Sequence, residues 1–299
     1  MNGAMDIRGS MTALVTPFRH GKVDWDRLNS LVDYQIDGGT DWIVPCGTTG
    51  ESPTLSHDEH GRVVEAVIAH TDGRKPIMAG SGSNYTAEAI LRTKHAEEAG
   101  ADAVLVVAPY YNRPPAEGLY RHFAEIAQCT RLPIVLYNVP FRTGVNIPND
   151  VVIRLYEDFE NVVAIKHATG SVDGVTELVN SGIAVLSGDD GMTWPIMALG
   201  GVGLISVAAN LCPELVKSLV DAGLAGDVDA ARGFHSQVLE LADMLGAYGP
   251  NPIPVKTAMA IAGLLEEEFR LPLWPLSAER REQLEADLRR LSVLTPILA

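Results

Sequence analysis

The sequence predicts an α/β protein, a (β/α)8 TIM barrel with a C-terminal helical appendage. About eight short β-branched runs alternate with amphipathic segments in the first ~225 residues, which is the size and order of such a barrel. The runs are continuously apolar, as parallel strands buried on both faces should be. A doubly wound open sheet is the alternative, but no Gly-x-Gly-x-x-Gly turn follows the first run, which favours the barrel.

Each expected strand is a short apolar run, and each expected helix is an amphipathic segment. The strands and their helices are, in order, 11–18 and 24–37, 42–46 and 57–70, 76–80 and 86–99, 103–109 and 115–128, 133–140 and 149–156, 161–170 and a short helix near Val175, 184–188 and 193–199, and 203–210 and 213–222. Beyond residue 226 the strands stop, and helices are expected at 228–246, 254–264 and 278–291. We therefore expect a catalytic barrel over 1–226 and a helical region over 227–299.

Composition limits the classes of partner. The chain has 23 basic and 38 acidic residues, a formal net charge of −15, which argues against nucleic acid or an anionic membrane as its main partner. The three cysteines fit no zinc or redox spacing, which indicates free thiols in a reducing compartment. The N-terminus has no apolar signal core, and the residues before Met5 read as an extension. We expect a cytoplasmic protein.

The sixth expected strand carries a single lysine, Lys166, near its carboxyl end. Strict alternation puts Val162 and Ala164 on the face of Lys166, and Val163 and Ile165 on the other face. An ammonium in so apolar a strand is costly unless it is paired or neutralised, and burial favours the neutral amine that forms Schiff bases. The strand alone leaves two interpretations open, a structural ion pair and a nucleophile.

Polar residues at the carboxyl ends of the other strands are candidates for a site, because active sites of such barrels lie at that end. Gly47-Thr-Thr-Gly50 lacks the lysine of a phosphate-binding loop, but its amides and hydroxyls suit a small carboxylate. Tyr110, Tyr111 and Tyr137 fall at strand ends, where packing is the common role and proton relay the alternative. Arg142, just beyond the fifth strand, is either a solvated loop charge or a grip for a substrate carboxylate.

Two acidic or histidine-bearing segments suggest metal binding at first. Ser56-His-Asp-Glu-His60 lacks the spacing of a zinc protease, and Ser56 with Glu59 forms a helix capping box. Asp189-Asp190 could bind magnesium, yet no further carboxylates cluster nearby in the sequence, so loop and cap roles are favoured. We expect no metal site.

The ordered motifs of the chain resemble the dihydrodipicolinate synthase and N-acetylneuraminate lyase family of class I aldolases. The resemblance runs almost end to end and rests on motifs that are weak singly and specific as an ordered set. They are Ala-Leu-Val-Thr-Pro-Phe, Gly-Thr-Thr-Gly-Glu-Ser, Pro-Tyr-Tyr-Asn-Arg-Pro, Tyr-Asn-Val-Pro, Ile-Lys-x-Ala-Thr-Gly, Leu-Ser-Gly-Asp-Asp, Ile-Ser-Val-x-Ala-Asn and Asn-Pro-Ile-Pro-Val-Lys.

The resemblance implies a condensation of pyruvate with L-aspartate 4-semialdehyde, in the pathway to diaminopimelate and lysine. It implies that Lys166 forms the Schiff base and that Tyr137 transfers protons with Thr48 and Tyr111, the last reaching in from a neighbouring subunit. A homo-oligomer, a dimer of dimers, is therefore expected. The implied substrate-binding residues are Thr49 for the pyruvate carboxylate, Arg142 for the semialdehyde carboxylate, and Ile205 and Gly188 in the pocket. Because the imine is the electron sink, no metal or organic cofactor is expected.

The resemblance also implies regulation by L-lysine as a feedback inhibitor. The positions that match such a site are Ser52, His57, His60, Asn84, Glu88 and Tyr110. Asn84 and Glu88 are four apart and can share one helix face, where an amide and a carboxylate suit an α-amino group. The chain departs from the family pattern at His167, where an acidic residue is usual, and at Pro53; alternation points His167 away from Lys166.

Three other functions compete with this assignment. One is a pyruvate-dependent class I lyase for a 2-keto-3-deoxy sugar acid or 4-hydroxy-2-oxoglutarate, against which Arg142 argues. Another is a metal-dependent aldolase or hydrolase of the same barrel shape, against which the scarcity of clustered ligands at strand ends argues. The last is a catalytically silent barrel, against which the joint presence of Lys166, Tyr137, Thr48 and Tyr111 argues.

Overall fold

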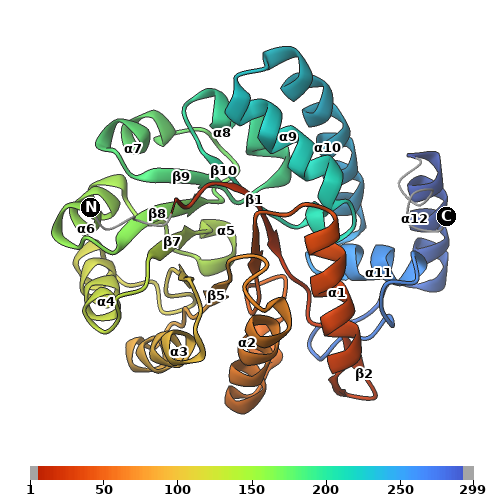
Figure 1. The fold of residues 1–299 in the computed structure, drawn as a ribbon, viewed down its shortest axis with the longest axis horizontal. Coiled ribbons are helices and arrows are strands. Elements are labelled where there is room, and N and C mark those ends of the chain that lie inside the picture. The colour runs from red at the N-terminus through yellow and green to blue at the C-terminus, as the bar shows by residue number, and fades with distance from the viewer. Residues whose placement is uncertain (1–5, 292–299) are drawn as a thin grey trace.

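A closed barrel of parallel strands lies at the centre of the molecule (Figure 1). The computed structural model describes residues 6–291, so the expected extension before Met5 and the last residues of the 227–299 region lie outside it. Eight strands pair in the order β4-β1-β10-β9-β8-β7-β6-β5, and a parallel bridge between Ile43 and Ile77 closes the ring. They are β1 (Gly9–Ala13), β4 (Trp42–Val44), β5 (Met78–Gly80), β6 (Ala103–Val107), β7 (Ile134–Asn138), β8 (Val162–His167), β9 (Ala184–Ser187) and β10 (Gly203–Ser206). The predicted TIM barrel is confirmed.

A ring of helices surrounds the strands, one after each strand, as Figure 1 shows. They are α1 (Trp25–Asp37), α2 (His57–Thr71), α3 (Thr86–Ala99), α4 (Ala116–Gln128), α6 (Asn149–Asp158), α7 (Val175–Ser181), α8 (Thr193–Ala198) and α9 (Pro213–Ala225). Their starts follow the sequence signals: the Asp24 carboxylate accepts from the Arg27 amide, and Ser56 and Glu59 form the predicted capping box.

Some elements of the structure were not predicted from the sequence. The first strand ends at Ala13, and the residues expected to extend it instead lead into a small antiparallel pair, β2 (Phe18–Arg19) with β3 (Lys22–Val23). A short helix, α5 (Pro140–Thr143), follows β7 and carries Arg142. Three single turns of 3₁₀ helix, η1 (Ser52–Thr54), η2 (Asp190–Met192) and η3 (Ala208–Asn210), lie in loops.

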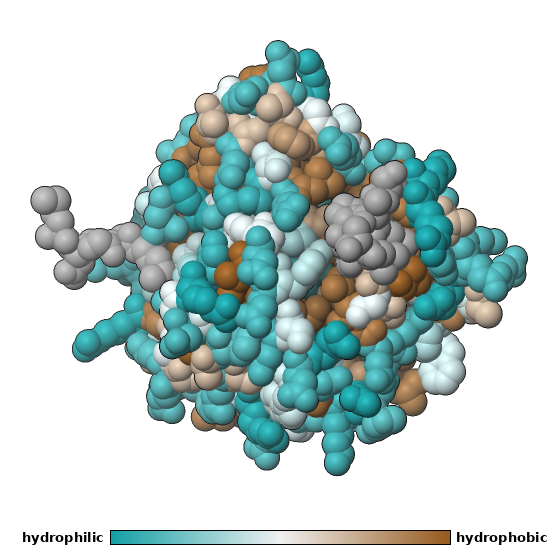
Figure 2. Space-filling view, turned by 45° about the vertical axis from the view of Figure 1, so that its right-hand side comes forward, coloured by the Kyte–Doolittle hydropathy of each residue, from teal (hydrophilic) through white to brown (hydrophobic). Residues whose placement is uncertain are grey.

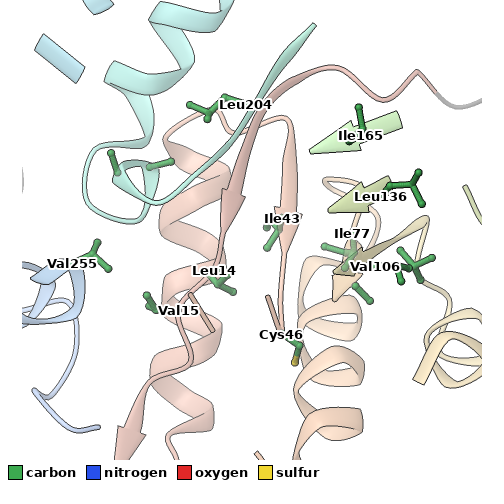
Figure 3. Close-up of a cluster of buried hydrophobic side chains, with 14 of the residues drawn as sticks. Leu14, Val15, Ile43, Cys46, Ile77, Val106, Leu136, Ile165, Leu204 and Val255 are labelled. Atoms are coloured by element: carbon green, nitrogen blue, oxygen red, sulfur yellow. The ribbon is translucent and has the colours of Figure 1, made fainter. Parts of the chain in front are cut away.

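The apolar core has two layers. The inner layer fills the barrel with side chains such as Met11, Val44 and Ile205, which lie together in one cluster. The outer layer packs the other face of the strands against the helices; Figure 3 shows Ile43, Leu136 and other strand residues of this layer. Each strand thus buries both faces, which explains why the sequence runs are apolar without alternation.

The strand of Lys166 departs from strict alternation. Ile134 pairs with Val162 and Val135 pairs with Ala164, so Val163 is an extra residue, a β-bulge. Val162 therefore packs in the outer layer together with Ile165, and Val163 packs against the inner layer. The prediction was wrong for these first two residues and correct from Ala164 onward, because the bulge precedes Ala164.

The helices after the barrel units are α10 (Val228–Tyr248), α11 (Ile253–Ile261) and α12 (Ala278–Arg290). Figure 1 shows them on one side of the barrel, with α12 outermost. α10 contacts α9 and η2, so it lies beside the loop that follows β9. In α12 only Leu284 and Leu288 are buried, as expected of a solvated amphipathic helix. The division into domains at residue 226 stays a prediction.

The outer surface is mainly hydrophilic on the face in Figure 2, with apolar residues in separate patches. Within residues 6–291, no helix combines the length and the apolar character needed to cross a bilayer.

Candidate active site

Lys166 is buried in the barrel with a tyrosine beside its amine. The side chain is 5 % exposed and lies in β8 next to β7, where its register partner is Tyr137. Its Nζ lies 4.2 Å from the centroid of the Tyr137 ring. The ion pairs found within residues 6–291 do not include Lys166, whereas the other fully buried lysine, Lys256, is paired with Glu51. The structural ion-pair alternative therefore finds no support at Lys166.

A glycine makes room for the lysine side chain. Gly188 follows β9, and a Cβ built there would lie 2.9 Å from Cε and 3.0 Å from Cγ of Lys166, and 2.6 Å from Cβ of Ala168. Cβ atoms in folded proteins essentially never approach another atom within 3.0 Å, so a larger residue would force Ala168 or Lys166 to shift. The sequence predicted Gly188 as a pocket residue; the structure gives it the specific role of clearing the path of Lys166.

Lys166 opens into a cavity of about 190 Å³ at the carboxyl ends of the strands. Of the predicted catalytic and substrate-binding residues, Thr49, Tyr137, Arg142, Lys166 and Gly188 line it. The helical C-terminal region lines it as well, through α10, the loop after it and the start of α11. The lining residues that the sequence interpretation did not assign to the site are Phe141, Ala168, Asp189, Asp190, Val207, Ala242, Leu245, Gly246, Gly249, Asn251, Pro254 and Val255.

Asn251 joins the two predicted carboxylate-binding residues. Its side-chain Nδ2 donates to Oγ1 of Thr49 at 2.9 Å, and its backbone oxygen accepts from Nη2 of Arg142 at 3.0 Å. Its Oδ1 is buried without a hydrogen-bond partner among the described residues. The asparagine therefore links Thr49 to Arg142 through its side chain and its backbone. The motif Asn-Pro-Ile-Pro-Val-Lys was the sequence signal that could have identified it.

Three predicted residues do not line the cavity. Ile205 is fully buried in the inner layer of the barrel, and Thr48 is half-buried in the glycine turn. Tyr111 is 88 % exposed and has a left-handed φ of 72°, which projects it from the loop after β6. No hydrogen bond within residues 6–291 joins the hydroxyl of Tyr137 to Thr48 or Tyr111. An exposed Tyr111 fits the expectation that it acts in another subunit.

A buried ion pair fixes the glycine turn to the C-terminal region. Glu51, which has a left-handed φ of 55°, and Lys256 of α11 are both fully inaccessible at their side chains. Lys256 Nζ also donates to the backbone oxygen of Glu268 at 2.8 Å and lies 4.5 Å from the Phe18 ring centroid. Burial lowers the pKa of Lys256, and the neighbouring Glu51 carboxylate opposes that effect. Because Glu51 is close in sequence to Thr49, and Lys256 to Asn251, the pair also supports the contact between those two residues.

The acidic pair after β9 has the loop and cap roles that the sequence favoured. Asp189 accepts from the Gly191 amide at 3.0 Å and so caps η2. The Asp190 carboxylate accepts from the hydroxyl of Ser206 and from the amides of Val207 and Ala208, each at 3.1 Å. Burial raises the pKa of Asp190 despite these donors. Within the described part of the chain, no three His, Cys, Asp or Glu side chains are grouped to hold a metal ion.

His167 points away from the cavity of Lys166, as alternation predicted. It lines a separate polar cleft of about 450 Å³ on the outer side of β8. Its Nε2 lies 3.0 Å from the Ser171 oxygen and 2.8 Å from Oγ1 of Thr169. Burial lowers the pKa of His167, so the imidazole is neutral at pH 7 and anchors the loop after β8.

The six positions predicted for an effector differ in burial. Ser52, Asn84 and Tyr110 are half-buried, and the backbone oxygen of Asn84 accepts from Asn112 at 2.8 Å. His57 is exposed and its Nδ1 lies 3.4 Å from Glu88. His60 is 4 % exposed; burial, with Arg92 nearby, lowers its pKa to about 4.

Comparisons with known proteins show which proteins this chain resembles. A profile of the Dihydrodipicolinate synthetase family matches residues 6–291. A 4-hydroxy-tetrahydrodipicolinate synthase of Pelobacter propionicus is 52 % identical over 286 residues, 95 % of this chain and 98 % of that protein. Two of the matching solved structures hold a small molecule. One is a dihydrodipicolinate synthase of Acinetobacter baumannii complexed with pyruvate, with a TM-score of 0.93, 44 % identity and coverage of 96 % of this chain and 100 % of that one. The other is the enzyme of Cyanidioschyzon merolae with lysine bound, with a TM-score of 0.91, 35 % identity and coverage of 96 % and 98 %.

A profile that spans nearly the whole chain and a relative of this identity and coverage establish the family. The chain belongs to the dihydrodipicolinate synthetase family.

Proposed function

We propose that the chain is a 4-hydroxy-tetrahydrodipicolinate synthase, which condenses pyruvate with L-aspartate 4-semialdehyde through a Schiff base on Lys166. The observation that carries the proposal is the isolated amine of Lys166, buried against Tyr137 in a cavity that also holds Thr49 and Arg142. The relative from Pelobacter propionicus has this activity by name, and pyruvate is bound in the homologous structure from Acinetobacter baumannii.

The first half of the reaction uses the inner end of the cavity. Thr49 and the turn amides hold the pyruvate carboxylate, and the unprotonated amine of Lys166 attacks the ketone carbon. Loss of water gives an imine. Tyr137, whose ring lies beside the amine, then moves a proton from the pyruvate methyl group, which leaves an enamine.

The second half uses the outer end, where Arg142 and Asn251 lie. Arg142, held by its hydrogen bond to the backbone oxygen of Asn251, binds the carboxylate of the semialdehyde. The enamine carbon attacks the aldehyde and forms the new carbon–carbon bond. The amino group then attacks the imine carbon, closes the ring and releases Lys166.

We further propose that the active unit is at least a dimer, expected as a dimer of dimers, in which Tyr111 completes the proton relay of a neighbouring subunit with Thr48. The support is the exposure of Tyr111 and its place outside the cavity of its own chain. We also assign L-lysine as an effector at Ser52, His57, His60, Asn84, Glu88 and Tyr110, supported by the lysine-bound homologue. The free state of the cysteines supports the expected cytoplasmic location.

A substrate panel tests the function. With pyruvate as donor, the enzyme should turn over L-aspartate 4-semialdehyde at full rate in EDTA, and should neither cleave 2-keto-3-deoxy sugar acids nor 4-hydroxy-2-oxoglutarate at comparable kcat/KM. A higher kcat/KM for a sugar acid would replace the proposed substrate. Loss of activity in EDTA that added metal restores would replace the proposed mechanism.

A further inference from the structure

The carboxylate of Glu88, which we assign to the effector site, is already engaged on both oxygens. Arg92 lies one helical turn further along α3 and donates from Nη2 to Oε1 at 2.8 Å. His57 Nδ1 lies 3.4 Å from the same oxygen, and the Ser83 hydroxyl donates to Oε2. An incoming amino group must therefore share or displace these donors to bind Glu88.

The Arg92–Glu88 pair lies in a largely buried setting. The side chains are 15 % and 22 % exposed, unlike most i, i+4 pairs on this protein. A second arginine nitrogen, Nη1, donates to the Gly82 backbone oxygen at 3.3 Å, which holds the guanidinium in place. A pair shielded in this way is screened less by salt than a surface pair and competes more strongly for the carboxylate.

Arg92 also faces the groove that contains the effector histidines. A groove of about 760 Å³ between α2 and α3 is lined by His57, His60 and Arg92. His60 Nε2 and Arg92 Nε are buried there without hydrogen-bond partners among residues 6–291. The Arg92 guanidinium repels an ammonium group that enters this groove.

We propose that Arg92 sets the sensitivity of the enzyme to L-lysine, because its guanidinium competes with the α-amino group of the effector for the Glu88 carboxylate. The inference rests on the proposed function, in which Glu88 and Asn84 bind that amino group. It assigns an attenuating role to a residue that the sequence motifs did not include. The site in this chain is accordingly weaker for lysine than the same site without the arginine.

The test is the concentration of L-lysine that halves the rate, measured for the wild type, Arg92→Met and Arg121→Met. Methionine keeps the length and packing of the stem without the charge. Arg92→Met should lower that concentration about tenfold, as expected when a charge-assisted hydrogen bond no longer has to be displaced. Arg121 forms the corresponding i, i+4 pair with Glu117 on the exposed face of α4, so Arg121→Met should leave it unchanged.

A ligand without the α-amino group adds a second readout. Inhibition by 6-aminohexanoate, which keeps an ammonium group but lacks the α-amino group, should be strengthened less by Arg92→Met than inhibition by L-lysine. An equal gain for the two compounds would contradict competition for Glu88. Arg92→Gln keeps a polar side chain in the groove and should increase the sensitivity to L-lysine less than Arg92→Met does. It serves as the test variant if Arg92→Met does not fold.

The results distinguish a wrong role for Arg92 from a wrong assignment of the effector site. If Arg92→Met and Arg92→Gln respond to lysine as the wild type does, or more weakly, Arg92 does not compete with the effector and the inference is wrong. If Glu88→Gln keeps the full wild-type response, or if no variant responds to lysine, the effector site itself is misassigned and the inference fails with it.

Discussion

Replacing Lys256 by Met should destabilise the protein more than the loss of any surface charge. The variant leaves the Glu51 carboxylate fully buried, and among residues 6–291 only the more distant Arg270 amide, at 3.4 Å, remains as a donor. Methionine fills most of the space of the lysine stem, so the cost comes mainly from the unpaired charge. Breaking a buried pair by removing one partner costs about 3–5 kcal/mol.

The loss of stability can be measured as a fall in the melting temperature. With about 2–4 °C for each kcal/mol in a domain of this size class, the melting temperature should fall by roughly 6–20 °C. The assay is thermal unfolding followed by circular dichroism at one fixed scan rate. Lys217→Met is the matched control, since Lys217 pairs with Asp221 at a partly exposed site and should cost at most about 1 kcal/mol.

A double variant shows whether the charge, and not the packing, is responsible. Glu51→Gln combined with Lys256→Met removes both buried charges and should be more stable than Lys256→Met alone. The assigned role of the pair is refuted if the losses of stability in the two single variants simply add in the double variant. It is also refuted if Lys256→Met melts within 2 °C of the wild type, which corresponds to a loss of about 1 kcal/mol or less.

Three further predictions follow from the site and its surroundings. Arg142→Met should reduce kcat/KM for the semialdehyde about 10- to 100-fold, the cost of a lost charge-assisted contact, while the kinetics of imine formation with pyruvate stay unchanged; an equal loss in both would contradict the assignment. Gly188→Ala should abolish imine formation in a folded protein, because the added methyl group meets Lys166, and normal formation would show that the lysine has another path. The pKa of Glu59 is lowered to about 2 by its hydrogen bonds with Arg270, so this contribution to stability is present above about pH 4.5 and is lost as the pH falls toward 2. Arg270→Met should therefore show a smaller loss of melting temperature between these two pH values than the wild type, and an equal loss would refute the linkage.

The sequence was most informative where one local pattern determines one structure. Continuous apolar runs identified all eight strands of the barrel, and Ser56 with Glu59 identified the start of α2. It was less informative where the structure depends on register, because the bulge at Val163 adds one residue without changing the apolar composition of β8. Patterns of hydrophobicity carry no signal for such a bulge.

The site was predictable in part for the same reason. Lys166 and Tyr137 lie at the ends of adjacent strands, and the barrel alone brings them together. Asn251 contacts Thr49 only because the chain folds back from a region far away in sequence, a contact that no local pattern encodes. The ion pair between Glu51 and Lys256 could not be predicted for the same reason. Lys256 lies in a segment whose sequence reads as an ordinary apolar helix.

The covalent imine between Lys166 and pyruvate can be trapped directly, by reduction with borohydride in the presence of pyruvate, followed by mass spectrometry of the digested protein. One added pyruvate-derived group is expected on the peptide that contains Lys166, and no adduct is expected in Lys166→Ala. An adduct on any other lysine, such as the buried Lys256, or product formed from the semialdehyde by Lys166→Ala, would contradict this role of Lys166.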